Sequence, residues 1–388
     1  NQTQNQYQKH WKKKYLKLPC SKKVSNMSKL ADKVFAKLQK LNQNATTLEN
    51  NTLSNVTDWI DTGCFVLNSI LSGSIYGGVP KGRITIFGGE SGCGKTFILN
   101  KILANAQRKG MIPIIFDTEV AVETEGAKNV GLDTSNVKYV PVDTVESCRN
   151  QIMAFLDDVE KEPELHGKFI ISIDSLGNLA SEKEINDAHS NKGAMDMGLR
   201  AKQLKSMMRM ITFKAAVTGT TVICSNHTYA DPGALHPTLV KQQAGGSGPI
   251  YMASILVQMA AKKEKTDASN ESDEAISESR NYSGVTLRML TVKNRFIPAF
   301  LQGEVYLNFK TGLEKYSGLK DIAVAHGIIQ QNGSTYAMGE QKLGYYKNWR
   351  NNDEVWNNIL PKIESSINEK YRYGKSLDEP TILEQDNE

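Results

Sequence analysis

The amino-acid sequence predicts an α/β fold in which a mostly parallel sheet is flanked by helices. Short apolar runs typical of buried strands recur along the chain, and helical patterns such as residues 96–108 and 148–160 separate most of the early ones. Hydrophobic residues make up 39% of the 388 residues, which is enough for a sizeable core and argues against global disorder. The strand-like runs are residues 83–87, 112–116, 137–141, 169–173, 221–225, 255–260 and 285–292.

The first residues of the chain form a basic segment. Residues 1–45 carry eleven lysines and one acidic residue, Asp32, although the whole chain has a net charge of only +5. The rest of the chain is therefore net acidic by about five charges. A basic arm on an acidic body excludes a uniformly basic DNA-binding surface, so any nucleic-acid site in the body must be a local patch or loop.

The N-terminal part divides at Met27. We expect residues 1–26 to be a disordered basic extension, with a nucleic-acid-binding arm and a transit peptide as alternatives. Residues 27–60 are expected to hold one helix and a linker. The linker, residues 42–57, is rich in Asn and Thr. The helix is indicated by an apolar stripe at helical spacing, made of Leu30, Val34, Leu38 and Leu41.

Residues 61–318 are predicted to form the α/β core, and residues 319–375 a small C-terminal region. Residues 262–283 lie between two strand-like runs and are polar, so we expect a mobile loop there. The tail, residues 376–388, holds five acidic residues and no basic one, which predicts disorder.

No run of about 18 apolar residues is present, so the sequence predicts no membrane span, and no apolar stretch typical of a secretory signal follows the basic N-terminus. The cysteines lack CxxC spacing, which favours a reducing, cytoplasmic location and argues against a zinc site. They are Cys20, Cys64, Cys93, Cys148 and Cys224.

A phosphate-binding loop lies between the first strand-like run and the helical stretch after it. Residues 89–96 match the pattern G-x-x-x-x-G-K-[ST] in full. Backbone amides in such a loop converge on phosphate oxygens, Lys95 reaches the β- and γ-phosphates, and the Thr96 hydroxyl binds Mg²⁺. We therefore expect ATP and Mg²⁺ as ligands. The loop residues are Gly89, Glu90, Ser91, Gly92, Cys93, Gly94, Lys95 and Thr96.

Acidic residues follow two further strand-like runs. Asp174 ends the apolar run 169–173 and is placed to hold Mg²⁺, with a turn-capping Asp as the alternative. The run 112–116 leads into Asp117-Thr118-Glu119. Because parallel strands deliver their C-terminal side chains to one edge of a sheet, Glu119 or Asp117 could act as the general base toward water. A solvated acidic turn is the third reading of this pair.

These motifs, in this order, resemble the RecA recombinase family over roughly residues 61–346, and within it most nearly the UvsX-type recombinases of T-even phages. The resemblance implies a RecA-like P-loop ATPase core. Besides the phosphate loop and Asp117-Thr-Glu119, the marks are Asp-Thr-Gly at 61–63, Leu-Asn at 67–68, Leu-Ser-Gly at 71–73, Ile-Asp-Ser-Leu-Gly-Asn-Leu-Ala-Ser at 173–181, Ser-Asn-His-Thr-Tyr at 225–229, Gly-Gly-Ser-Gly-Pro at 245–249, Val-Lys-Asn-Arg at 292–295 and Tyr-Ser-Gly-Leu at 316–319.

The resemblance implies roles for particular residues. Glu119 matches the family's catalytic glutamate, and Asn226 or His227 its γ-phosphate sensor. Lys293 and Arg295 match a pair that acts on the ATP of a neighbouring subunit. The helix with the apolar stripe matches the one that packs on the next subunit of a filament.

Two DNA-binding loops are implied at residues 183–197 and 229–249. Both are rich in glycine and polar residues and carry few charges, so a solvated loop is the ordinary alternative. Loops of this kind contact phosphates through backbone amides as well as side chains. The residues expected at DNA are Lys183, Lys192, Tyr229, Lys241, Gly245 and Gly246.

The sequence departs from the family in its adenine site. Family members commonly stack adenine on a tyrosine, and Gly126 stands at that position here, while Glu123 can still accept from the adenine amino group. The loop 262–283 is also longer than usual in the family.

The implied function is ATP-dependent DNA strand exchange in recombination and in recombination-dependent repair or replication, on filaments formed with single-stranded DNA. Its partners would be single-stranded DNA, homologous duplex DNA and further copies of the chain, with mediator and single-strand-binding proteins as additional candidates. The expected location is the cytoplasm, that of the host if a phage encodes the chain. The alternatives are a ring helicase with the same core and a DNA-binding filament with a degenerate ATPase.

Overall fold

The computed structural model describes residues 22–190, 197–229, 240–265 and 282–371. The chain divides into two compact units, residues 1–55 and residues 56–388. In the smaller unit, helix α2 (Lys22–Leu41) is followed by turns. The helix predicted from Met27 thus begins five residues earlier, because the residues between contain no glycine or proline to stop it. Most of the predicted extension 1–26 lies outside the described residues.

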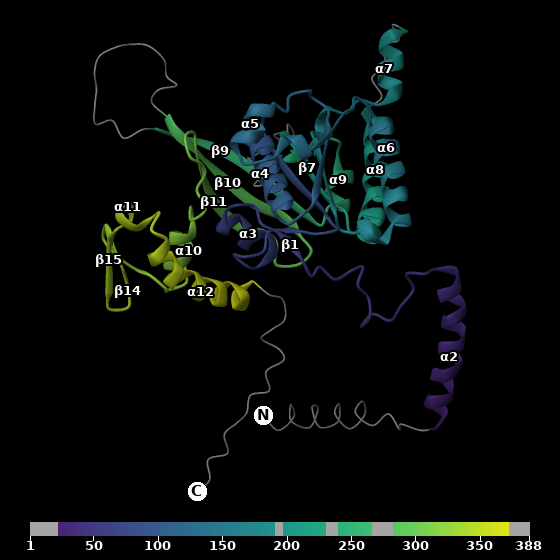
Figure 1. The fold of residues 1–388 in the computed structure, drawn as a ribbon, viewed down its shortest axis with the longest axis horizontal. Helices are drawn as coiled ribbons and strands as arrows, with labels where there is room; N and C mark the ends of the chain where they lie inside the picture. The colour runs from purple at the N-terminus through teal and green to yellow at the C-terminus, as the bar shows by residue number, and fades with distance from the viewer. Residues whose placement is uncertain (1–21, 191–196, 230–239, 266–281, 372–388) are drawn as a thin grey trace, which may run out of the picture. The chain divides into compact units, whose positions relative to one another are not determined.

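The larger unit is built on one central sheet (Figure 1). Within the described residues it has ten strands in the order β12-β11-β10-β9-β3-β7-β6-β4-β5, with β8 paired to β7. Strands β3 to β7 and β9 are parallel, whereas β10, β11 and β12 add an antiparallel edge. The strands are β3 (Ile84–Gly89), β4 (Ile112–Asp117), β5 (Lys138–Pro141), β6 (Phe169–Asp174), β7 (Thr221–Tyr229), β8 (Gln242–Gln243), β9 (Ile255–Lys265), β10 (Tyr282–Asn294), β11 (Gln302–Asn308) and β12 (Gly312–Leu313).

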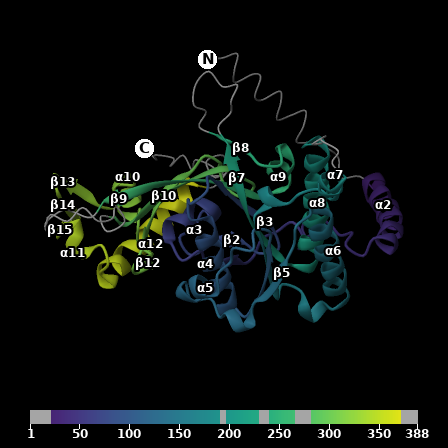
Figure 2. The ribbon, with the colours of Figure 1, turned by 90° about the horizontal axis from the view of Figure 1, so that it is seen from above.

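The predicted α/β class is confirmed, and each of the seven strand-like runs overlaps a strand of this sheet. Strands such as β3 are buried along their whole length because helices cover both faces of the sheet. Phe87 of β3 belongs to one hydrophobic cluster, whereas Ile84 and Ile86 belong to the other. Figure 2 shows α4 and α5 on one side of the strands and α6 and α8 on the other. The helices of this layer arrangement are α3 (Phe65–Ser72), α4 (Lys95–Arg108), α5 (Thr124–Asn129), α6 (Val145–Lys161) and α8 (Met197–Thr218).

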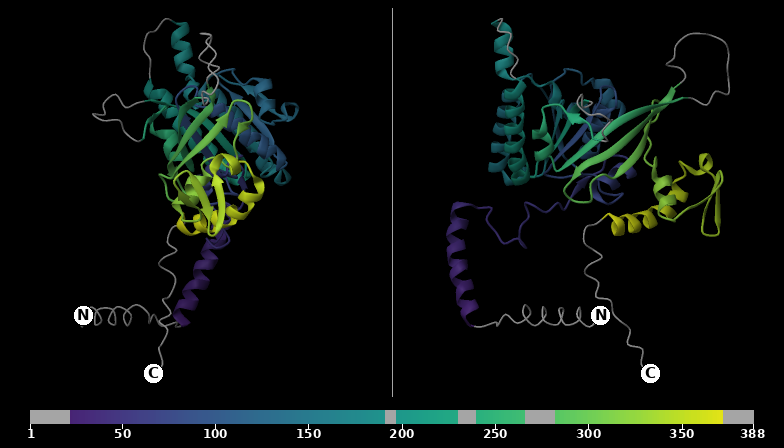
Figure 3. Two further views of the ribbon diagram at one scale, coloured as in Figure 1. Left: turned by 90° about the vertical axis from the view of Figure 1, so that its left-hand side faces the viewer. Right: turned by 180° about the vertical axis from the view of Figure 1, so that it is seen from behind.

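A small C-terminal region packs against the antiparallel edge of the larger unit (Figure 3). Its core is aromatic: Trp356 is fully buried and stacks on Tyr316, with ring centroids 5.0 Å apart and 10° between the planes. Such stacking adds to the burial of apolar area. The region consists of α10 (Leu319–Ala325), β13 (Gln330–Asn332), β14 (Thr335–Met338), β15 (Gln341–Tyr345), α11 (Tyr346–Trp349) and α12 (Asp353–Lys370).

The stretches predicted as loops are partly regular. Residues 183–189 belong to helix α7 (Glu182–His189), whose N-cap Ser181 accepts a hydrogen bond from the Glu184 amide at 3.1 Å. This Ser-x-x-Glu arrangement is a helix-start signal, so the first half of the stretch predicted as a loop is helical. Residues 191–196 lie outside the described part, and a role of the stretch in DNA binding stays a prediction. Residues 229–249 include β8 and the start of α9 (Ser247–Met252). Of residues 262–283, the two ends extend β9 and β10, and residues 266–281 lie outside the described part.

None of the helices that the structure describes is both long and apolar enough to cross a membrane.

Candidate functional site

The phosphate loop connects β3 to α4, as the sequence predicts. Gly92 and Gly94 have φ angles of 74° and 79°, a region that favours glycine. A Cβ atom at Gly89 would lie 2.4 Å from Cys93 Sγ, so only glycine fits at the start of the loop. The Lys95 ammonium is buried and donates to the carbonyl oxygens of Gly89 and Glu90, at 3.0 and 2.8 Å. A cation thus lies inside the curve of the loop, at a helix N-terminus, which suits phosphate.

Thr96 and Asp174 meet beside this loop. The Thr96 hydroxyl donates to Asp174 Oδ2 at 2.7 Å, and the Ser225 hydroxyl donates to Asp174 Oδ1. Hydroxyl and carboxylate oxygens are the ligands that Mg²⁺ prefers, and it commonly takes only one or two carboxylates beside phosphate and water. No group of three or more His, Cys, Asp or Glu residues in the described ranges could hold a metal ion alone. The oxygen set therefore fits Mg²⁺ bound together with a phosphate.

Glu119 lies in the turn after β4 and faces the same edge of the sheet. Its Oε1 accepts from the Ser175 hydroxyl at 2.7 Å and lies 3.2 Å from His227 Nε2. Burial acts to raise the pKa of Glu119, but the hydrogen bonds from Ser175 and His227, with the charge of Lys95, hold that pKa below its ordinary value. The carboxylate is therefore ionised at neutral pH, which is the state that a general base needs.

Asp117, the alternative general base, has another environment. It is buried, and its carboxylate accepts hydrogen bonds from the amides of Glu119 and Val122, both at 3.0 Å, and from the Tyr139 hydroxyl at 3.1 Å. These donors hold the turn that presents Glu119. The geometry thus directs Glu119, and not Asp117, toward the phosphate loop.

Strand register explains why His227 reaches this place. In the β3–β7 pair, Gly88 lies opposite Asn226 and Gly89 opposite His227. Asn226 is fully buried and donates to Gln243 Oε1 at 3.1 Å and to the Ala244 carbonyl at 3.0 Å, so its amide is engaged in the interior. Of the two sensor candidates, His227 is the one that meets Glu119.

Sequence reasoning missed Ser175, Ser225 and Gln243 at this site. Ser175 directly follows Asp174, so its position after a strand end could have indicated it. Gln243 gave no such signal, because its burial beside Gly88 depends on the pairing of β8 with β7.

The candidate adenine residues lie together at the start of α5. Glu123 is the N-cap residue of that helix, and a Cβ atom built at Gly126 would lie 3.9 Å from Glu123 Oε2. Apart from its chain neighbours and the backbone of α5, no other atom of the described residues comes within 4 Å of that Cβ position, so the surface beside Glu123 is open where the family commonly has a tyrosine.

The residues expected at DNA are distributed over several elements. Lys183 lies on α7 and pairs with Asp187 at 2.9 Å, and Tyr229 is exposed at the end of β7. Lys241 forms an ion pair with Glu90, so it contacts the phosphate loop. Lys192 lies outside the described residues. Gly245 and Gly246 precede α9 with positive φ angles of 79° and 72°.

Lys293 and Arg295 lie at the end of β10 and contact α9. Lys293 Nζ donates to the carbonyls of Ile250 and Tyr251, both at 2.8 Å, and Arg295 donates to the Tyr251 carbonyl at 3.3 Å. Burial, with the neighbouring charge of Arg295, lowers the pKa of Lys293 to about 8. The two cations thus lie next to each other at the surface, and among the described residues their side-chain hydrogen bonds go to α9.

The comparisons with known proteins agree with this geometry. A family model described as the RecA N-terminal domain matches residues 26–314. Protein RecA of Acidothermus cellulolyticus is 31% identical over 327 residues, which cover 84% of this chain and 88% of that protein. Protein RecA of Nitratiruptor sp. is 30% identical over 329 residues, covering 85% and 88%. The recombination and repair protein of Enterobacteria phage T4 is 27% identical over 344 residues, covering 85% and 83%.

Proposed function

This chain belongs to the RecA family of recombinases, and from that premise we propose that it is an ATP-dependent DNA strand-exchange protein that works as a filament on single-stranded DNA. Strand exchange would serve homologous recombination and recombination-dependent repair or replication in the cytoplasm. The resemblance to the phage T4 protein supports this setting, and the host cytoplasm would apply if a phage encodes the chain.

One observation carries the proposal: the phosphate loop, the metal ligands and the candidate base meet at one edge of the sheet. Asp174 lies opposite Asp117 in the β4–β6 register, and His227 lies opposite Gly89 in the β3–β7 register. The hydrogen bond from Thr96 to Asp174 joins the loop to the metal ligand. A chance glycine-rich loop would not bring these groups together.

In this proposal each residue has a defined task. The loop amides and Lys95 bind the β- and γ-phosphates of ATP, and Thr96 and Asp174 hold Mg²⁺, which neutralises phosphate charge when bound. Glu119 orients the attacking water and takes its proton, because its carboxylate is ionised and faces the phosphate loop. His227 contacts Glu119 and lies near the end of β7, where the second DNA-binding segment begins, so it would sense the γ-phosphate and relay its presence to that segment.

DNA binding is assigned to the segments around α7 and between β7 and α9. The bases of single-stranded DNA are held there for pairing with homologous duplex. Because Lys241 from the second segment pairs with Glu90 of the phosphate loop, occupancy of the nucleotide site and order of that segment affect each other. Mediator and single-strand-binding proteins remain additional candidate partners.

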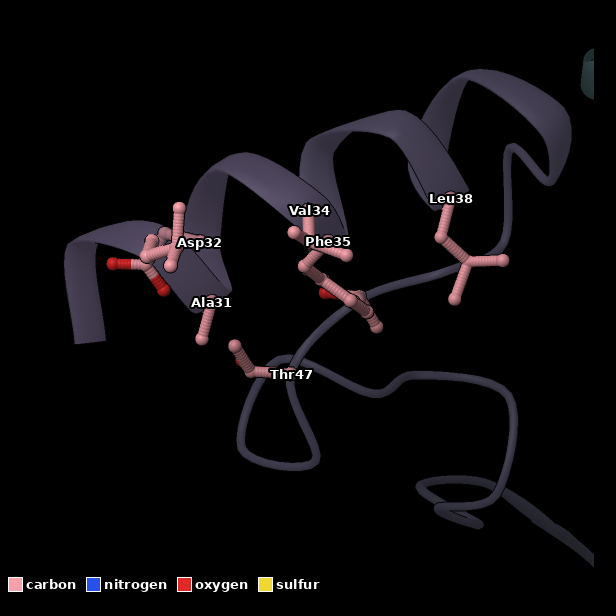
Figure 4. A pocket seen from close by; sticks show the side chains of 8 residues that line it. Ala31, Asp32, Val34, Phe35, Leu38 and Thr47 are labelled. Carbon is pink, nitrogen blue, oxygen red and sulfur yellow. The ribbon is translucent and has the colours of Figure 1, made fainter. Parts of the chain in front are cut away.

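Self-association is assigned to α2. Leu30, Val34 and Leu38 are 65%, 61% and 51% exposed on this helix, although apolar side chains on a helix normally face a core. Figure 4 shows Val34, Phe35 and Leu38 along one open groove, with Thr47 of the following turns beside it. A neighbouring copy of the chain would cover this stripe in a head-to-tail filament.

Two other functions share parts of this site. A ring helicase would use the same core but needs a motor arrangement that threads DNA. A filament with a degenerate ATPase is disfavoured because Lys95, Thr96, Glu119 and Asp174 are all present. Electron microscopy of the chain with single-stranded DNA and ATP separates these functions. Helical filaments that disassemble with hydrolysis are expected, and closed rings, or filaments without any ATPase activity, would overturn the proposal.

A further inference from the structure

A short 3-10 turn, η3 (Leu176–Asn178), lies between the catalytic edge of the sheet and the first candidate DNA-binding segment. It follows Asp174 and Ser175 directly. The Asn178 side-chain amide donates to the Thr118 carbonyl at 2.7 Å, which fixes η3 to the turn that carries Glu119. The turn is therefore connected to the candidate base from one side.

The same turn contacts the candidate sensor. A Cβ atom at Gly177 would lie 2.8 Å from His227 Cδ2, which is closer than real Cβ atoms pack, and 3.2 Å from the Ala244 Cβ, which is a tight contact. The Gly177 backbone thus lies directly against the imidazole, without a side chain between them. A displacement of η3 by a few tenths of an ångström would be felt by His227 and by its contact with Glu119.

Arg200 joins this turn to α8. Its Nε donates to the Leu179 carbonyl at 2.6 Å, and another guanidinium nitrogen donates to the Gly177 carbonyl. The guanidinium is planar and rigid, so two bonds to carbonyls two residues apart fix both the position and the orientation of the turn. Arg200 lies at the start of α8, half-buried, and no function assigned above uses it.

The start of α7 and the start of α8 are therefore each connected to η3. On the α7 side, Leu179 leads through Ala180 and Ser181 into the helix. The Ala180 amide donates to the Asp143 carbonyl, and the Ala180 carbonyl accepts from the Val145 amide. On the α8 side, the connection is made by Arg200 through its hydrogen bonds to the carbonyls of Leu179 and Gly177. A DNA strand that reorients the start of α8 would pull on the carbonyls of η3 through this residue.

We propose that Arg200 is a positioning residue that couples DNA binding at the segment around α7 to the Glu119–His227 pair, by holding η3 against His227. The inference rests on the proposed DNA-stimulated ATPase activity and names the contacts through which DNA binding would affect Glu119 and His227. Arg200 does not touch the nucleotide in this scheme; it acts through the backbone of Gly177.

The test compares Arg200→Gln with Arg200→Lys and with Arg209→Gln. Arg209 is exposed on the same helix, so the control removes the same charge from α8 without touching η3. ATPase rates are measured with and without single-stranded DNA, together with nucleotide binding and thermal stability. For Arg200→Gln, the ratio of stimulated to unstimulated rate is expected to fall about tenfold, equivalent to ~1.4 kcal/mol of activation free energy. Arg200→Lys keeps a cation but loses the guanidinium that makes two hydrogen bonds, so its ratio of stimulated to unstimulated rate should lie between those of Arg200→Gln and wild type. Arg209→Gln should keep the wild-type ratio.

A purely structural role predicts a different pattern. The stimulated and unstimulated rates of Arg200→Gln would then fall by the same factor, together with the melting temperature, and this would overturn the inference. If the wild-type chain shows no DNA stimulation, the proposed function itself fails. If wild type is stimulated and Arg200→Gln equally so, the proposed function stands and the inference alone fails.

Gly177→Ala provides a second test should Arg200→Gln fail to fold. The added methyl group would displace the His227 ring from Glu119 without touching Arg200. DNA stimulation is expected to fall in this variant as well, while DNA still binds in the presence of ATP. Unchanged stimulation in Gly177→Ala would show that η3 does not carry the coupling.

Discussion

The backbone amide of Glu119 donates a hydrogen bond to Asp117 Oδ1 over 3.0 Å. The two carboxylates that follow β4 thus have different tasks: Asp117 holds the turn and Glu119 is presented by it. The sequence alone left both open as the general base, because two residues of spacing do not separate a capping side chain from a catalytic one. The difference can be measured.

Glu119→Gln keeps the size of the side chain and removes its ability to take a proton. ATP binding should persist while DNA-stimulated hydrolysis slows by on the order of 10²- to 10⁴-fold. Filaments on DNA should then outlast those of the wild-type chain. Turnover near the wild-type rate would exclude Glu119 as the base.

Asp117→Asn is the matched comparison. The buried amide would place N–H groups against at least one of the donors that Asp117 now accepts from, at a cost of about 1–3 kcal/mol in the free energy of unfolding. We therefore expect a lower melting temperature for Asp117→Asn, but an almost unchanged one for Glu119→Gln. Thermal unfolding followed by circular dichroism distinguishes the two variants, and equal stability would contradict the structural role of Asp117.

A composite ATP site predicts complementation between two inactive variants. Lys95→Ala disables the phosphate loop, and Lys293→Ala with Arg295→Ala disables the cations proposed to act on the neighbour. Each alone should have little DNA-stimulated ATPase. In an equal mixture, roughly a quarter of the interfaces join an intact loop to an intact pair, so a substantial part of the activity should return.

The control for this mixture is one chain that carries all three substitutions. Mixed with either parent, it can form no additional intact interface, so only dilution should be seen. Absence of any gain in the two-variant mixture, with co-assembly on DNA demonstrated, would place Lys293 and Arg295 away from the neighbour's ATP.

The lowered pKa of Lys293 predicts a pH dependence. Burial and Arg295 lower that pKa to about 8, so the ammonium is charged below this pH and becomes neutral above it. The part of the DNA-stimulated ATPase rate that depends on this cation should fall as the pH rises from about 7 to about 9. Lys293→Arg keeps its charge throughout this range and should flatten the profile. Parallel profiles for the two proteins would refute the assignment.

The exposed stripe on α2 predicts a variant that folds but does not assemble. Leu30→Ser with Leu38→Ser removes apolar area from surface positions, so the free energy of unfolding should change by no more than about 0.5 kcal/mol for each substitution. Filament formation with ATP and single-stranded DNA, followed by light scattering, should be strongly reduced. Leu48→Ser, a substitution at a leucine that is 84% exposed outside the helix, is the control and should assemble normally. If the Leu30→Ser, Leu38→Ser double variant assembled as well as Leu48→Ser, the apolar stripe on α2 would not be an interface between copies.

The elements that the sequence predicted well are those whose signal is local. The strand β3, the loop at 89–96 and helix α4 follow one another directly, and apolar periodicity with glycine spacing indicates all three. The helix α7 was missed although Ser181 and Glu184 formed a capping signal, because the family resemblance placed a DNA-binding loop over the same residues. The lengths of β9 and β10 were also underestimated. Polar residues such as Lys262 continue the pairing of the two strands where no hydrophobic core covers them, so apolar patterning does not indicate these strand ends.

Other features depend on contacts between distant segments. Nothing near Arg200 in the sequence indicates that its guanidinium reaches the carbonyls of Gly177 and Leu179, more than twenty residues away. The burial of Gln243 beside Gly88 likewise follows from strand pairing alone. Such contacts require the sheet order, which short-range patterns do not specify.

The oxygen atoms of Thr96 and Asp174 already lie within 2.7 Å of each other, and Ser225 holds the second carboxylate oxygen. A divalent cation that arrives with its nucleotide therefore meets ligands whose rotamers are fixed, and little side-chain entropy is lost when they bind it. More of the free energy of nucleotide binding remains available for work elsewhere in the molecule. In the proposed filament, that free energy would be available to order the DNA-binding segments when the nucleotide binds.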